Sequence, residues 1–178
     1  MNVIVMRHGE TNYNVMGLCS ETEGEHVHLT EKGKLQAKLV SRRLKSESFD
    51  CIITSKLYRT IQTASYINEF HNAPRIVDKR INDRYTGCDS KPIEEFRTLV
   101  SHDPYNARPP GGESLVDVKE RIDDFIRWLS SQPYDTVLIV THSVIVKMII
   151  IILTEKPLTH IKELRIGPAS YEKLHLNC

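Results

Sequence analysis

Two short apolar runs constrain the fold of this chain more than any other feature. Val3 to Met6 and Val137 to Val140 are uninterrupted apolar segments, mostly of β-branched residues, and each leads directly into polar residues. A strand that is apolar on both sides must be buried on both sides, as in a parallel sheet covered by helices. The runs therefore predict an α/β fold: a three-layer sandwich with a mostly parallel central sheet flanked by helices.

Segments with a helical period alternate with the apolar runs, which supports this fold class. Ser114 and Asp117 form a capping-box pattern for the most regular helix, which extends to Leu129. The 178 residues contain no linker or internal repeat, so we predict a single domain, residues 1–178. The other expected elements are strands at 51–54, 75–81 and 169–176, helices at 30–44, 93–100 and 144–153, a helix capped by Ser55, and irregular segments at 12–29 and 85–112.

Composition argues against several classes of partner. Lysine plus arginine total 24 and aspartate plus glutamate total 23, so the net charge of +1 is too small to attract nucleic acid or an anionic membrane. The longest apolar stretch, 137–153, is interrupted by His142, Ser143 and Lys147 and is shorter than the ~20 apolar residues of a membrane helix. No leader segment precedes the first strand, and the four cysteines form no close pair. We therefore expect reduced thiols and a cytoplasmic location.

Ionisable residues follow each of the four expected parallel strands. In open α/β sheets the ligand site lies beyond the carboxyl ends of the strands. Guanidinium groups bind phosphate oxygens in pairs of hydrogen bonds, a neutral imidazole is a nucleophile toward phosphorus, and a carboxylic acid can protonate a leaving alcohol. The combination predicts metal-free phosphoryl chemistry at one edge of the sheet. The residues at these strand ends are Arg7 with His8, Arg59, Asp83, and His142 with Ser143.

Five motifs extend this pattern from residue 3 to about residue 153. In chain order they are Arg7-His8-Gly9-Glu10-Thr11 with Asn14; Leu29-Thr30 and Gly33 with Gln36-Ala37; Ser55, Arg59-Thr60 and Gln62-Thr63-Ala64; Pro110-Gly111-Gly112-Glu113-Ser114; and Val140-Thr141-His142-Ser143. Together they resemble the signature of the histidine phosphatase superfamily, in its phosphoglycerate mutase-like branch.

The resemblance implies a role for each site residue. His8 would be the nucleophile that becomes phosphohistidine, and Asp83 would be the general acid. The phosphoryl oxygens would be held by Arg7, Arg59 and His142, with Asn14 as a secondary contact in the pocket and Ser143 beside the second histidine. No cofactor or metal is implied, and the pair His26 and His28 has no third ligand.

Two departures from the family pattern qualify this assignment. Asp83 is one methylene shorter than the glutamate of the mutases, so Glu10 and Glu113 are kept as substitute acids. Ser143 replaces the glycine that commonly follows the second histidine, which would narrow the pocket.

Hydrolysis of a small phosphomonoester is the function that the resemblance favours, and a phosphoprotein substrate stays open. The segment between the acid turn and residue 110 is short, and its Lys91, Arg97 and Arg108 do not reproduce the paired arginines of the mutases. The alternatives are a mutase-type phosphotransferase, a catalytically weak phosphate-binding scaffold and, least favoured, a metallohydrolase. The segments 12–29 and 85–110 are expected to carry substrate specificity. The sequence carries no prediction about oligomeric state.

Overall fold

The computed structural model describes residues 1–177 and contains one five-stranded sheet with the strand order β3-β2-β4-β1-β5. The first four strands in this order are parallel, and β5 is antiparallel to β1 at the edge. This confirms the predicted fold class. The strands are β1 (Asn2–Arg7), β2 (Cys51–Thr54), β3 (Arg75–Val77), β4 (Thr136–Thr141) and β5 (Tyr171–His175).

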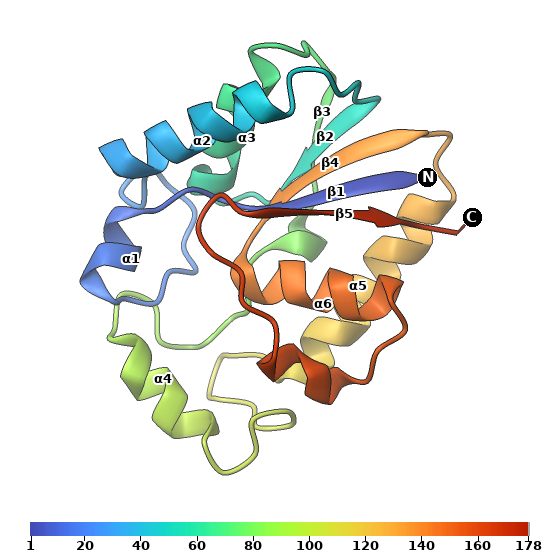
Figure 1. Cartoon of the computed structure of the whole chain (residues 1–178). Helices are drawn as coiled ribbons and strands as arrows, with labels where there is room; N and C mark the ends of the chain where they lie inside the picture. The colour runs from blue at the N-terminus through green and yellow to red at the C-terminus, as the bar shows by residue number, and fades with distance from the viewer. Residues whose placement is uncertain (178) are drawn as a thin grey trace.

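Helices cover both faces of the sheet (Figure 1). Val3 and Val5 of β1 pack in one core cluster with α5 (Leu115–Ser130) and α6 (Ser143–Leu153). Ile4 and Met6, which point to the other side of the sheet, pack in a second cluster with α2 (Glu31–Arg43) and α3 (Tyr58–Asn68). Alternate residues of one strand thus enter different cores, which is why the apolar run has no polar interruption.

Local capping explains where several elements begin. The capping box of Ser114 and Asp117 opens α5 as predicted, and α4 (Ile93–Val100) matches its expected range. The predicted Ser55 cap is wrong, because α3 begins at Tyr58 with Leu57 as its cap residue. The third strand ends at Val77, four residues early, because the Asp78 side chain accepts a hydrogen bond from Arg80 and caps a 3₁₀ helix (Lys79–Ile81).

One α-helix of the described residues was not predicted. α1 (Asn12–Met16) lies in the segment expected to be irregular, and it is a single turn with no buried residue. Thr11 and Asn14 form its capping box, and Gly17 ends it in the left-handed conformation, with φ of 68°. The only other regular element in the part of the chain described is a 3₁₀ helix (Leu158–Lys162).

Cys19, Cys51 and Cys88 are buried free thiols, and Cys178 lies outside the described residues. None of the helices within residues 1–177 has the length and apolar character to cross a membrane.

The loop after β1 packs backbone-to-backbone against the start of α2. A Cβ on Gly33 would lie 2.0 Å from the carbonyl oxygen of Glu10, and a Cβ on Gly9 would lie 2.6 Å from the carbonyl oxygen of Gly33. Neither contact can be relieved by rotating a side chain. Glycine at these positions therefore lets α2 approach the chain that follows His8.

Gly33→Ala is expected to lower the free energy of unfolding by about 1–3 kcal/mol, because the added methyl must displace backbone in a packed contact. Urea unfolding measures the loss. Gly167→Ala is the control, because a Cβ there meets nothing within 4 Å. Equal stability of the two variants would contradict the proposed packing role of Gly33.

Candidate active site

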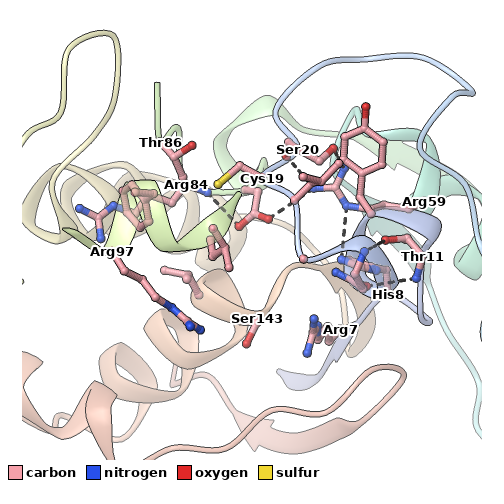
Figure 2. Close-up of a pocket in the computed structure, with 18 residues that line it drawn as sticks. Arg7, His8, Thr11, Cys19, Ser20, Arg59, Arg84, Thr86, Arg97 and Ser143 are labelled. Carbon is pink, nitrogen blue, oxygen red and sulfur yellow. Dashed lines mark hydrogen bonds and ion pairs between the residues drawn. The ribbon is translucent and has the colours of Figure 1, made fainter. Parts of the chain in front are cut away.

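A cavity of about 400 Å³ opens at the carboxyl ends of the central strands (Figure 2). Six of the seven predicted site residues line it, and they come from five separate segments of the chain. His142 does not line the cavity; it is fully buried, with its ring centroid 5.2 Å from that of His8. The six lining residues are Arg7, His8, Asn14, Arg59, Asp83 and Ser143.

The hydrogen bonds of His8 assign its tautomer. Nδ1 lies 2.7 Å from the carbonyl oxygen of Gly9, which can only accept, so Nδ1 carries the proton. Nε2 then has a free electron pair, and Arg59 Nε donates to it at 3.3 Å. Burial and the neighbouring guanidinium groups of Arg59 and Arg7 hold the pKa of His8 well below its ordinary value. The imidazole is therefore neutral, with Nε2 as its nucleophilic atom.

Two guanidinium groups lie near this nitrogen, that of Arg59, which is buried, and that of Arg7, which is half-buried. Arg59 is only 3% exposed; it donates to Ser20 Oγ and to the Ser20 carbonyl oxygen, both at 3.1 Å, and to Asp83 Oδ2 at 3.3 Å. Arg7 donates through one terminal nitrogen to the Ile166 carbonyl oxygen at 2.9 Å, while its buried Nε has no partner among residues 1–177. Burying two cations beside one carboxyl group is unfavourable unless an anion joins them. The arrangement suits a phosphoryl group.

Asp83 is the one carboxyl group among residues 1–177 that lines the cavity. Its side chain is 30% exposed, and Oδ1 accepts a hydrogen bond from the Arg84 backbone at 2.9 Å. Burial raises the pKa of Asp83 above its ordinary value, against the opposing effect of Arg59. An acid with a raised pKa is more often protonated, as a proton donor must be.

Both substitute acids, Glu10 and Glu113, form ion pairs with basic residues outside the cavity lining. Glu10 pairs with Lys32 at 2.9 Å, and Glu113 pairs with Arg121 at 2.8 Å. Neither lines the cavity. Among the three candidate carboxyl groups, the geometry favours Asp83 as the acid.

His142 follows β4 directly and is held from behind by Ser55. Its Nε2 lies 2.8 Å from Ser55 Oγ, which also contacts Thr60 Oγ1 at 2.9 Å. Its Nδ1 has no hydrogen-bond partner among residues 1–177 and lies 3.6 Å from Asp83 Oδ2. Burial, with a further contribution from Arg59, holds the pKa of His142 well below its ordinary value. Ser55 thus orients the ring, and Nδ1 is left for a ligand.

The sequence interpretation missed Ser55 as a site residue, although a signal was present. Ser55 comes immediately after β2, as His8 follows β1 and His142 follows β4. Most of the other missed residues lie in or beside the two irregular segments, where no motif marks them. They include Leu18, Cys19, Ser20, Arg84 and Thr86, and, from the predicted helix at 93–100, Ile93 and Phe96.

Local structure fixes the positions of the remaining two predicted residues, Asn14 and Ser143. Asn14 Oδ1 accepts a hydrogen bond from the Thr11 backbone at 3.1 Å, so the capping box of α1 fixes this side chain at the cavity. Ser143 is the first residue of α6, whose N-terminus faces the cavity. Helix N-termini favour anions through unpaired N–H groups and the helix dipole.

Known proteins carry the same pattern along the whole chain. The model of the histidine phosphatase superfamily (branch 1) matches residues 3–177. Phosphoserine phosphatase 1 of Hydrogenobacter thermophilus is 31% identical over 186 residues, which cover 99% of this chain and 87% of the relative. Adenosylcobalamin/alpha-ribazole phosphatase of Salmonella typhimurium is 29% identical over 187 residues, with 99% and 91% coverage.

This chain is also similar in fold to a solved structure of a phosphatase. The crystal structure of the alpha-ribazole phosphatase from Shigella flexneri superposes with a TM-score of 0.91 at 26% identity, covering 99% of this chain and 91% of that one. The match of fold, motif order and family model over nearly the full length leads to one conclusion: this chain belongs to the histidine phosphatase superfamily, branch 1.

Proposed function

We propose that the protein hydrolyses phosphomonoesters through a phosphohistidine formed at His8, without a metal ion or cofactor. One observation carries the proposal: a neutral imidazole presents Nε2 to a cavity beside the buried guanidinium group of Arg59, the half-buried one of Arg7 and one carboxyl group. The printed names of the relatives, phosphoserine phosphatase and alpha-ribazole phosphatase, support hydrolysis of a small phosphate ester.

The proposed reaction has two transfers of the phosphoryl group. His8 Nε2 attacks phosphorus as the bond to the ester oxygen breaks, and Asp83 gives its proton to that oxygen. The alcohol leaves, and water then attacks the phosphohistidine. Asp83, now a carboxylate, accepts the proton of the water as the P–N bond breaks and phosphate is released.

The remaining residues would stabilise charge on the phosphoryl oxygens. Arg7 and Arg59 bring positive charge at the cavity. His142 lies behind the cavity lining, with its unpartnered Nδ1 3.6 Å from Asp83 Oδ2. Asn14 and Ser143 would add contacts at the rim. Because these groups are already in place in the folded chain, they need no reorganisation during the reaction, and electrostatic stabilisation of this kind is usually the largest contribution to rate.

The same proposal includes the domain organisation, the cellular location and the size of the substrate. A single domain, residues 1–178, would carry the activity in the cytoplasm, where the buried thiols of Cys19, Cys51 and Cys88 stay reduced. The cavity of about 400 Å³ fits a small phosphomonoester. Neither nucleic acid nor a membrane is part of the proposed function.

Phosphate release from a panel of phosphomonoesters, including p-nitrophenyl phosphate, tests the proposal. We expect one phosphate released for each alcohol, at a rate that EDTA leaves unchanged, because guanidinium groups supply the positive charge. Isomerisation of 3-phosphoglycerate without phosphate release would contradict hydrolysis and favour a mutase. Tight binding of phosphate without turnover of any ester would favour a scaffold.

A further inference from the structure

Arg97 lines the cavity but has no part in the proposed reaction. It belongs to α4 (Ile93–Val100), a helix that lies apart from the sheet (Figure 1). Its side chain reaches from α4 toward Ser143 at the start of α6 (Figure 2). The side chain is 64% exposed, and its ion-pair partner is Glu94 of the same helix. The guanidinium group is therefore accessible to solvent at the cavity wall, beside Glu94.

A second cation on this wall is buried without a carboxylate partner. Arg84 is only 6% exposed and forms no ion pair within residues 1–177. It donates to the carbonyl oxygens of Glu113 at 2.8 Å and Ala107 at 3.3 Å, and its guanidinium lies 4.8 Å from the ring centroid of Phe96. This stacking ties α4 to the turn that carries Asp83, and it fixes the helix turn from which Arg97 extends.

The side chains that line the cavity carry more positive than negative charge. Four arginines line it, Arg7, Arg59, Arg84 and Arg97, against the single carboxyl group of Asp83. A bound phosphate dianion offsets the pair beside His8. Because Arg97 pairs with Glu94, the remaining positive charge of the wall at α4 comes from Arg84, which donates only to carbonyl oxygens. Ile93 and Phe96 of α4 line the cavity there and reduce the screening of a charge by water.

We propose that the natural substrate carries a second anionic group on its alcohol part, and that Arg97 binds this group and determines specificity. The inference rests on the proposed hydrolase function and deepens it. A guanidinium fork matches the paired oxygens of a carboxylate or a phosphate. The substrate class is thus a small phosphomonoester with a carboxylate or a second phosphate, and the cavity of about 400 Å³ limits it to metabolite size.

Matched pairs of esters that differ in the second anion test the proposal. Glycerol 3-phosphate is compared with 3-phosphoglycerate, O-phosphoethanolamine with O-phosphoserine, and 3-hydroxypropyl phosphate with propane-1,3-diyl bisphosphate. The first two pairs report a carboxylate and the third reports a phosphate. We expect the wild type to favour the member with the second anionic group in at least one pair by about 10-fold or more in kcat/KM, the size of one charge-assisted interaction.

Arg97→Gln is expected to reduce this preference to about 1 while leaving kcat/KM for p-nitrophenyl phosphate unchanged, because the nitrophenyl group has no second anion. Glu94→Gln removes the competing partner of Arg97 and is expected to increase the preference. Arg127→Gln is the matched control: Arg127 is 71% exposed, pairs with Asp124 three residues away and does not line the cavity.

The outcomes separate the two proposals. An unchanged preference in Arg97→Gln, or an equal loss on p-nitrophenyl phosphate, overturns the role of Arg97 while the hydrolase function stands. No preference in the wild type for any ester with a second anionic group, or turnover of a phosphopeptide above that of every small ester, overturns the substrate class. Failure of the wild type to release phosphate from any ester overturns the hydrolase function itself.

Discussion

His8→Asn is expected to abolish phosphomonoester hydrolysis, lowering kcat/KM for p-nitrophenyl phosphate by at least about 10⁴-fold, as loss of an enzymatic nucleophile does. The amide of asparagine has no electron pair that can attack phosphorus at the position of Nε2. The strand end keeps its backbone bonds, in which the His8 N–H donates to Thr141 at 2.9 Å and the His8 carbonyl accepts from Ala169 at 3.0 Å. The loss should therefore be chemical and not structural.

Trapping of the intermediate gives a second measurement. Brief incubation of the wild type with a ³²P-labelled ester, followed by quenching in alkali, should leave label that is released by acid, as expected of a phosphoramidate. The His8→Asn variant should carry none. His160→Asn is the control, since His160 pairs with Glu163 and does not line the cavity. Retained hydrolysis in His8→Asn, or label on the chain of that variant, would contradict the mechanism.

Asp83→Asn is expected to lower kcat by about 10²- to 10⁴-fold for esters of alkyl alcohols, the usual contribution of a positioned general acid. The loss should be smaller for p-nitrophenyl phosphate, because nitrophenolate leaves without a proton. Asp83→Glu adds one methylene and should keep more activity than Asp83→Asn. Equal losses for alkyl and nitrophenyl esters would argue against an acid role for Asp83.

The pH dependence follows from the shifted pKa values. His8 must be neutral to attack, and its pKa is held well below its ordinary value of 6.5, so activity should persist into acid solution. Asp83 must be protonated, and its pKa is raised above 3.8, so activity should fall as the pH rises through that raised value. A bound phosphate dianion raises this pKa further by like-charge repulsion. Measured profiles of kcat/KM for an alkyl ester should lose their alkaline limb in Asp83→Asn.

The parts of this molecule that sequence predicts well are those set by local pattern. β1 is apolar without interruption because Val3 and Ile4 enter different cores, on opposite sides of the sheet. The apolar run in the sequence therefore indicates burial on both sides. His8 and His142 could be predicted because each follows such a run directly, where the carboxyl end of a strand meets the site. Family motifs then connected these strand ends to one another.

The parts that could not be predicted depend on contacts between distant residues. Ser20 becomes a neighbour of Arg59 only when the loop after α1 folds back, and the Glu21 carboxylate accepts a hydrogen bond from the Thr86 backbone at 2.6 Å to hold that loop. Ser55 has a side chain typical of a helix cap, and its Oγ accepts a hydrogen bond from the Leu57 backbone at 3.2 Å. The same hydroxyl also contacts Nε2 of His142, 87 residues away, at 2.8 Å. The periodicity of the sequence does not indicate such hydrogen bonds between distant residues.

The wall that carries Arg97 has a hydrophobic core of its own. Cys19, Cys88, Phe96, Val100 and Ala107 form a small cluster separate from the two clusters that pack on the sheet. A small satellite cluster is stabilised by fewer buried contacts, so it can open at a lower free energy than the whole domain. Substitutions in this wall can therefore change the shape of the cavity while the strands that precede His8 and His142 keep their packing.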